Sequence, residues 1–284
     1  MIKFLKAFFA SAVLCLGLSS CLDSDDDAKR NDSFVNCFAY VDDLSTHTSA
    51  GYNGMSYDLE LNYTKGTVKV VINHLQVSED KTYDEVTIAD VPFVITKEGW
   101  IEVTSAAVEG IAAGQTVKFS NFGLALCDRI TVDGRYPGFY ARYTVDAKYS
   151  VLSAVWNQYQ FGTTTSTYSG GSYSTKETNY LVGFDVKAGT LNLMMRNTRF
   201  IDKMPAMNIL LEKIPFTISG TTASFHVDEI IPKIGDTPYP GFKITNFSGY
   251  YDFSKGLVIS FNCKPETMPY DFTVNVDCKY TFEE

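Results

Sequence analysis

Cys21 is the residue whose surroundings most clearly predict a chemical reaction. It follows an apolar run, residues 7–17, that two lysines precede. This run is shorter than the roughly 20 residues that a helix needs to span a bilayer, so residues 1–20 are predicted to be a signal peptide that is removed. Cleavage after Ser20 would place a thiol, which is a nucleophile in its thiolate form, at the new N-terminus.

The segment Leu18-Ser19-Ser20-Cys21 resembles the lipobox of bacterial lipoproteins, in which small residues precede a cysteine that is acylated. The acidic run that follows, residues 22–27, has too little apolar content to fold, so residues 21–30 are expected to form a disordered tether. This run also resembles the export signal of surface-exposed Bacteroidetes lipoproteins, although a solvated spacer is the alternative. The resemblance implies a membrane partner through the lipid anchor at Cys21, in the outer membrane and at the cell surface.

Other residue types that perform catalysis show no spacing typical of an active site. The sequence has no Gly-x-Ser-x-Gly, no phosphate-binding glycine loop and no Cys/His nucleophile pattern. Paired carboxylates occur at Asp42-Asp43 and Glu79-Asp80, and the second pair is predicted to lie in a turn. The histidines lie far apart, without metal-ligand spacing; they are His47, His74 and His226. We predict no enzyme, no catalytic residue, no metal and no cofactor, although folding could still bring carboxylates together.

The charge of the chain disfavours nucleic acid as a partner. The formal net charge is −9, and no cluster of lysine and arginine supplies the basic surface that a phosphate backbone requires. An acidic balance fits a soluble, outward-facing protein.

The chain contains an internal repeat of the strands that would position a functional site. Residues 57–95 align without a gap with residues 180–218, at a constant offset of 123 residues (180 − 57). Apolar side chains alternate with polar ones in both copies, which is the period of a β-strand. A one-residue slip would turn every apolar side chain toward solvent, so the shared alternation fixes the register. The aligned positions include Tyr57 over Tyr180, Leu59 over Val182, Leu61 over Phe184 and Pro92 over Pro215.

The alignment continues beyond residue 95 with small changes of offset. Residues 119–122 lie over residues 244–247, and residues 145–151 over residues 276–282, which pairs Asp146 with Asp277. This places an insertion of the second copy near residues 248–269. The two prolines are predicted at an edge or bulge, where no backbone N–H is needed for pairing. His74 and Asn197, which end an apolar face, are predicted at a rim.

The turns between the predicted strands are short and polar, and no segment keeps a 3.6-residue period. Short connections cannot form parallel crossovers, so the sheets are expected to be antiparallel. The predicted fold is all-β, with two tandem homologous antiparallel β-sandwich or flattened-barrel domains. The predicted divisions are a signal peptide, a tether, copy one and copy two, at residues 1–20, 21–30, 31–152 and 153–284.

Four cysteines remain after Cys21, and an exported protein could join them in disulfides with three possible pairings for two bridges. No cysteine of one copy aligns with a cysteine of the other. Free, buried thiols that pack as small hydrophobic groups are therefore favoured over bridges. The four are Cys37, Cys127, Cys263 and Cys278.

A ligand site that only one copy has should lie where the copies differ. They differ in the predicted insertion and in the Ser/Thr/Gly-rich stretch Gly162–Thr175, which is either a flexible hairpin loop or an exposed polar strand pair. Tyrosines supply rigid contact area at low entropic cost. The candidate ligand-binding residues are Tyr168, Tyr173, Tyr250 and Tyr251.

The lipobox, the acidic run and the repeated Gly-Thr and Pro-Phe strand pairs together resemble uncharacterised Bacteroidetes cell-envelope lipoproteins with tandem β-sandwich or calycin-like domains. The resemblance implies a surface-anchored, non-catalytic binding or adhesion module for glycan or protein. Two alternatives stay open, which are a fimbria-like structural subunit that polymerises by strand addition and a calycin-like small-molecule carrier.

Overall fold

The computed structural model describes residues 28–127, 129–132, 134, 138–265 and 268–283. The predicted signal peptide, Cys21 and the acidic run lie outside these residues. Every paired strand runs antiparallel to its neighbours, and the all-β prediction is confirmed. Within the described residues there is no helix of the length and apolarity that a bilayer crossing would need.

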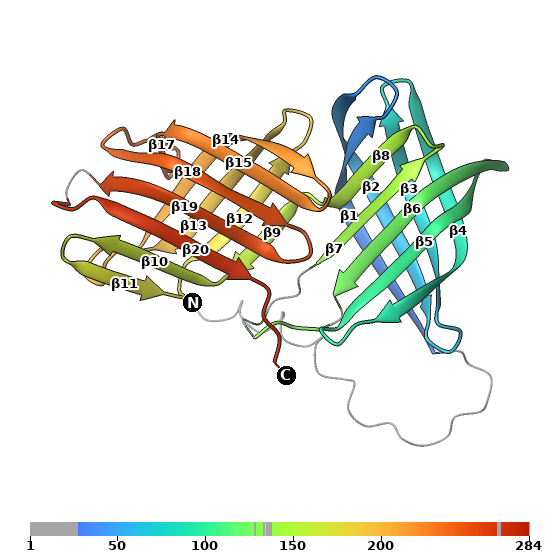
Figure 1. The fold of residues 1–284 in the computed structure, drawn as a ribbon, viewed down its shortest axis with the longest axis horizontal. Coiled ribbons are helices and arrows are strands. Elements are labelled where there is room, and N and C mark those ends of the chain that lie inside the picture. The colour runs from blue at the N-terminus through green and yellow to red at the C-terminus, as the bar shows by residue number, and fades with distance from the viewer. Residues whose placement is uncertain (1–27, 128, 133, 135–137, 266–267, 284) are drawn as a thin grey trace, which may run out of the picture.

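The first domain is a closed barrel of eight strands in chain order, because β8 also pairs with β1 (Figure 1). Of the two predicted architectures, this domain is the barrel. β1 begins and β8 ends slightly outside the predicted bounds, residues 31 and 152. The strands are Lys29–Asp43 (β1), Thr48–Asn62 (β2), Thr67–Ser78 (β3), Lys81–Ile95 (β4), Trp100–Ala112 (β5), Gln115–Cys127 (β6), Phe139–Val145 (β7) and Tyr149–Val155 (β8).

The second domain is a curled 12-stranded sheet. Its strands are Asn157–Phe161 (β9), Thr163–Tyr168 (β10), Gly171–Thr175 (β11), Asn179–Asp185 (β12), Thr190–Thr198 (β13), Met207–Ser219 (β14), Thr222–Ile230 (β15), Lys233–Ile234 (β16), Thr237–Pro238 (β17), Phe242–Asp252 (β18), Gly256–Pro265 (β19) and Phe272–Lys279 (β20). The stretch Gly162–Thr175 therefore contains a polar strand pair, which was one of its two predicted structures.

The bend at Gly162 joins the two sides of this sheet. On one side of the glycine β9 pairs with β12, and on the other side β10 pairs with β20. A Cβ at this position would lie 2.2 Å from the Asp277 carbonyl oxygen. Only glycine fits so close an approach of two backbones. The bend lets β10 pair with β20 while β9 pairs with β12, and this curls the sheet into a barrel.

The internal repeat reappears as matching irregularities of the backbone. Positive φ angles occur at the same offset of 123 residues in Gly66 and Gly189, in His74 and Asn197, and in Asp90 and Lys213. Asn121 and Asn246, which align at the second offset, also have positive φ angles. Two of these pairs, Asp90 with Lys213 and Asn121 with Asn246, coincide with register shifts in both copies, so the copies share these β-bulges as well as their strands.

One predicted position and one alignment need correction. His74 does not lie at the end of its strand, because β3 continues to Ser78, whereas Asn197 is one residue from the end of β13; both residues have positive φ angles. Asp146 lies in the turn between β7 and β8, whereas Asp277 lies inside β20, so these residues are not equivalent. The predicted insertion near residues 248–269 followed from that pairing and is also wrong, because a tight turn joins β18 to β19 through the pair Asp252 and Gly256.

Aromatic side chains fill the barrel interiors. In the first barrel the hydroxyls of Tyr57 and Tyr143 lie 2.8 Å apart, and the Tyr143 ring packs 5.4 Å from Phe119. In the second barrel Tyr180, at the position aligned with Tyr57, has its hydroxyl 2.5 Å from Thr164 Oγ1. The aligned tyrosines therefore hydrogen-bond to different partners in the two copies. Each has a partner because a buried hydroxyl needs one.

The cysteines after Cys21 are free and buried, as predicted. Burial raises the pKa of the Cys37 thiol to about 12 and also raises the pKa of Cys263. Thiols held in the neutral form are poor nucleophiles, so these cysteines act as packing groups.

Candidate functional site at the junction of the two barrels

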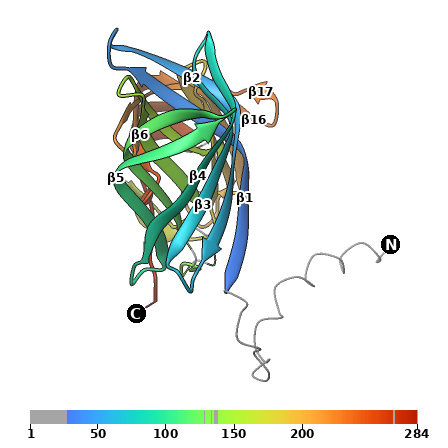
Figure 2. The ribbon, with the colours of Figure 1, turned by 90° about the vertical axis from the view of Figure 1, so that its right-hand side faces the viewer.

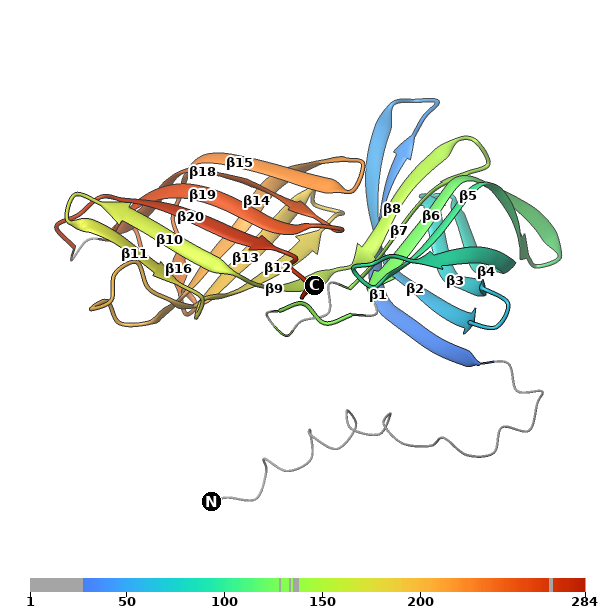
Figure 3. The ribbon, with the colours of Figure 1, turned by 60° about the horizontal axis from the view of Figure 1, so that its bottom comes forward.

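The outer wall of the first barrel is packed against one end of the second (Figure 3). Phe38, Leu152 and Ala154 point out of the first barrel, yet they belong to the hydrophobic core of the second. The Phe38 ring lies 5.6 Å from Phe184 and 5.9 Å from Phe253. Since β1 and β8 are buried on both faces here, the two barrels share a core that fixes their relative position.

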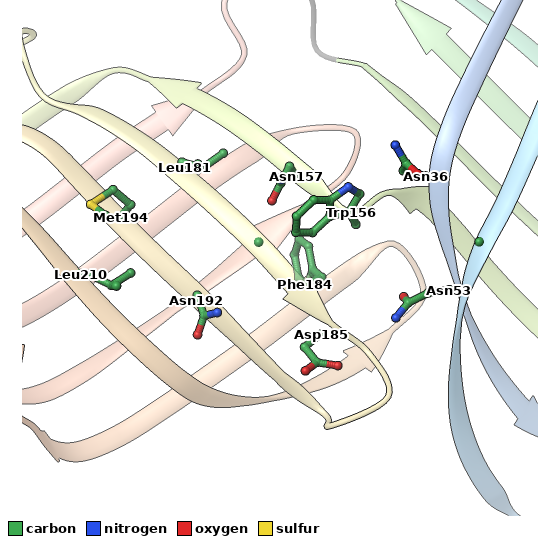
Figure 4. Close-up of a pocket in the computed structure, with 12 residues that line it drawn as sticks. Asn36, Asn53, Trp156, Asn157, Leu181, Phe184, Asp185, Asn192, Met194 and Leu210 are labelled. Carbon is green, nitrogen blue, oxygen red and sulfur yellow. The ribbon is translucent and has the colours of Figure 1, made fainter. Parts of the chain in front are cut away.

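Bulges in the first barrel turn two asparagines toward this junction. The pairing of β1 with β2 shifts register on both sides of Cys37, where Asn36 and Gly54 have positive φ angles of 56° and 93°. Such bulges bend the strand and redirect side chains, and asparagine tolerates the left-handed conformation better than most residues. Asn36 and Asn53 consequently face the second barrel across a gap (Figure 4).

The outer face of the second barrel forms the floor of the pocket. Leu181 pairs with Met194 and Met194 pairs with Leu210, which gives an apolar row across β12, β13 and β14. Beside this row Gly183 lies between Asn157 and Asn192, its partners on the neighbouring strands. A glycine at this point leaves a hollow between two amide side chains, because an added Cβ would lie 3.0 Å from Asn157 Oδ1.

Trp156 is the residue that links the two barrels. Its backbone N–H donates to the Asn36 carbonyl at 3.2 Å, and its carbonyl accepts from the Phe184 N–H at 2.9 Å. The backbone is therefore bonded to both domains. The side chain is 44% exposed and lines the pocket with Asn157 and Asp185 (Figure 4). An exposed indole beside polar groups can stack on an apolar ligand face.

The resulting cavity has a volume of about 540 Å³, within the usual range of roughly 300–1,000 Å³ for small-ligand sites. Its polar lining side chains, among the residues that the structure describes, are amides and one carboxylate, without lysine or arginine; they are Asn36, Asn53, Asn157, Asn192 and Asp185. An amide side chain has both donor and acceptor atoms, which suits hydroxyl groups that also do both. Two of the oxygens already accept from the backbone, since Asn192 Oδ1 accepts from the Lys213 N–H at 2.9 Å and Asp185 Oδ1 from the Ala188 N–H at 3.1 Å. Amides and a carboxylate can hydrogen-bond to neutral hydroxyl groups, whereas the carboxylate would repel an anion.

The other groups considered for chemistry have structural roles. Asp43 accepts hydrogen bonds from Ser45, chiefly from its side chain, and these hold the carboxyl pKa down at about 2. Glu79-Asp80 lies in the turn between β3 and β4, as predicted. Among the described residues, no group of three histidine, cysteine or acidic side chains could hold a metal ion.

The four predicted ligand-binding tyrosines do not come together. Tyr168 and Tyr173 lie at the β10–β11 hairpin, where Tyr168 packs 4.9 Å from Tyr270. Tyr250 and Tyr251 lie in β18 near Gly256, at the opposite end of the strands that separate them.

The prediction that Tyr251 binds a ligand is wrong. Its side chain is fully buried, and its hydroxyl lies 3.0 Å from the Tyr280 hydroxyl and 3.2 Å from Gln160 Nε2. It belongs to a polar contact inside the second barrel and presents no surface to a ligand.

The residues that line the pocket belong to no sequence motif that predicts a ligand site. Trp156 was visible as one of two tryptophans, beside the boundary between the copies. Two further signals for the pocket were Asn157, next to Trp156, and Asn192, which the alternation of its strand places on the outer face. The contribution of Asn36 and Asn53 depends on bulges and on docking of two domains, which no local pattern predicts.

No model of a known protein family matches the chain, and no curated protein matches it. Among solved structures, the chain is similar to a crystal structure of a "putative outer membrane protein" from Bacteroides fragilis. The identity is 14% and the TM-score 0.35, with 87% of this chain and 96% of that chain covered.

Proposed function

We propose that the protein is a lipoprotein, anchored in the outer membrane at Cys21 and exposed at the cell surface, that binds a neutral glycan without catalysis. The lipobox-like segment and the acidic run after it support the anchor and the location. The ligand site is the junction pocket, with Trp156 as a stacking surface and the surrounding amides as hydrogen-bond partners for sugar hydroxyls.

One observation carries this proposal, namely that both barrels contribute to a single preformed pocket. Asn36 and Asn53 come from the first barrel, while Asn157, Asp185 and Asn192 come from the second. The shared core around Phe38 holds the two halves in place before any ligand arrives. A site that is already ordered loses less entropy on binding, which favours affinity.

Features of the first barrel weigh against the two alternatives. All eight of its strands are paired on both sides within the described residues, so a donor strand from a fimbria-like partner meets no free edge there. Its interior holds a packed cluster of rings, including Tyr57 at 4.8 Å from Phe139 and Phe122 at 5.7 Å from Tyr143. A carrier would need that space for its cargo.

A glycan array probed with residues 28–284, which contain both cores, tests the proposal. We expect one or more neutral oligosaccharides to bind, and Trp156→Ala to weaken that binding about 30-fold or more, as loss of a central aromatic anchor does. Tyr173→Ala is the matched control, since that tyrosine lies on the distant β10–β11 hairpin and should leave the affinity unchanged.

Three outcomes would count against the assignment. A hit whose affinity survives Trp156→Ala would place the site elsewhere, and equal losses in both variants would point to a general effect on folding. If the array is blank and only matrix proteins, immobilised and screened in parallel, bind, the ligand is protein and the glycan assignment fails.

A further inference from the structure

We propose that the end of the first barrel at which β1 begins lies against the lipid surface. This inference rests on the proposed anchor at Cys21. Its evidence is separate from the junction pocket, because it comes from the residues that surround Ala28, the first described residue.

Hydrogen bonds and ring contacts connect the start of β1 to the end of β4. The Tyr63 N–H donates to the Ala28 carbonyl at 2.9 Å, and the Phe93 N–H donates to the Gly66 carbonyl at 3.0 Å. The rings of Tyr63 and Phe93 lie 5.7 Å apart, edge to face. The start of β1, where the described residues begin, therefore lies next to the β2–β3 turn and the last residues of β4 (Figure 2).

Large apolar side chains are exposed at this end. Val94 and Ile95 are 60% and 55% exposed at the end of β4. The β4–β5 turn that follows contacts the segment after β6, where Arg129 Nη1 donates to the Lys97 carbonyl at 3.3 Å. That segment adds two more exposed apolar residues, Ile130 and Val132. We call these four the apolar rim; the members are Val94, Ile95, Ile130 and Val132.

Charged residues of both signs accompany the apolar rim. The basic residues are Lys29, Arg30, Lys65, Lys97 and Arg129, and the acidic ones are Asp32, Glu60, Glu98 and Glu283, with ion pairs from Lys29 to Glu60 and from Arg30 to Asp32. The other end of the barrel is acidic, with Asp43, Glu79, Asp80 and Asp146 against Lys81 and Lys148. An end that combines exposed apolar groups with a near balance of charge suits a lipid interface better than an acidic end does.

The reach of the chain agrees with this placement. Ala28 is seven residues after Cys21 in the chain (28 − 21). Fully extended they span at most about 25 Å, so an acylated Cys21 would keep this end of the barrel near the bilayer. The apolar rim can then insert, while the junction pocket lies on a different part of the molecule.

A depth measurement on the full chain tests this orientation. Ile95→Cys and, as matched control, Ile111→Cys would be labelled with an environment-sensitive fluorophore, because these isoleucines have similar exposure, 55% and 52%, at opposite ends of the barrel. The native thiols other than Cys21 are buried and should not react. The protein, purified from cell membranes, would be placed in phosphatidylethanolamine/phosphatidylglycerol vesicles that contain lipids brominated on the acyl chains.

We expect bromine to quench the label at residue 95, as for a group about 5–10 Å into the interface, and to leave the label at residue 111 unquenched. A double change, Lys65→Glu with Lys97→Glu, should reduce the quenching at residue 95. Equal quenching at both positions, or none at either in vesicle-bound protein, would overturn the orientation. If Cys21→Ala leaves the protein in the membrane fraction, the anchor itself is wrong, and this outcome is distinct from the first.

Discussion

Phe38→Ala should lower the free energy of unfolding of the whole described chain by about 3–5 kcal/mol, the usual loss for a fully buried phenylalanine. The reason is that Phe38 is completely buried although it points out of its own barrel. Its removal leaves a cavity beside Phe184 and Phe253 in the core of the second barrel. Chemical denaturation followed by circular dichroism measures the change.

Val35→Ala is the control for Phe38→Ala, because Val35 lies on the same strand and is 60% exposed. Its replacement should change the stability by no more than about 0.5 kcal/mol. If Phe38→Ala costs less than about 1 kcal/mol, the barrels do not share a core and the junction pocket has no fixed shape.

Gly162→Ala is the second change with a large expected effect. The added methyl group would meet backbone atoms, at 2.2 Å from the Asp277 oxygen and 2.6 Å from Cys278 Cα, and neither atom can move without displacing β20. We expect a loss of about 3 kcal/mol, at the upper end for overpacking, and a lower midpoint of thermal unfolding.

Gly123→Ala provides the comparison, because its nearest contact would be an ordinary 3.5 Å from the Arg142 oxygen and its φ angle is not positive. That variant should be neutral or slightly more stable, since alanine reduces the freedom of the unfolded chain. Equal stability of the two variants would show that the bent strand does not approach β20 as closely as described.

The internal repeat and the all-β fold could be predicted because they depend on the alternation of apolar and polar side chains, which is present in both copies. The alignment of Tyr57 with Tyr180 and of Pro92 with Pro215 holds in the structure, where Asp90 and Lys213 are matching bulge residues. The alignment of Asp146 with Asp277 was wrong, because a turn in the first copy and a strand in the second share the pattern Val-Asp-x-Lys-Tyr. A local pattern cannot distinguish these, because the turn depends on positive φ angles at both Asp146 and Ala147.

The candidate site was beyond sequence reasoning for a related reason. Tyr251 was proposed for a loop because an insertion was inferred there, but its strand turns the side chain into the core. Phe38 would be expected to face solvent from the alternation of β1, and only docking of the barrels buries it. The pocket depends on that docking, so its residues become neighbours only in the folded pair of domains.

Fluorine NMR of protein labelled with 5-fluorotryptophan tests the central claim most directly, because the chain has two tryptophans. Trp156 lines the junction pocket, whereas Trp100 is buried away from it beside Tyr140. On titration with a glycan that binds in the array, the Trp156 resonance, assigned by Trp156→Phe, should shift and saturate while the Trp100 resonance stays in place. Saturable binding that leaves the Trp156 resonance unmoved would contradict a ligand site at the junction.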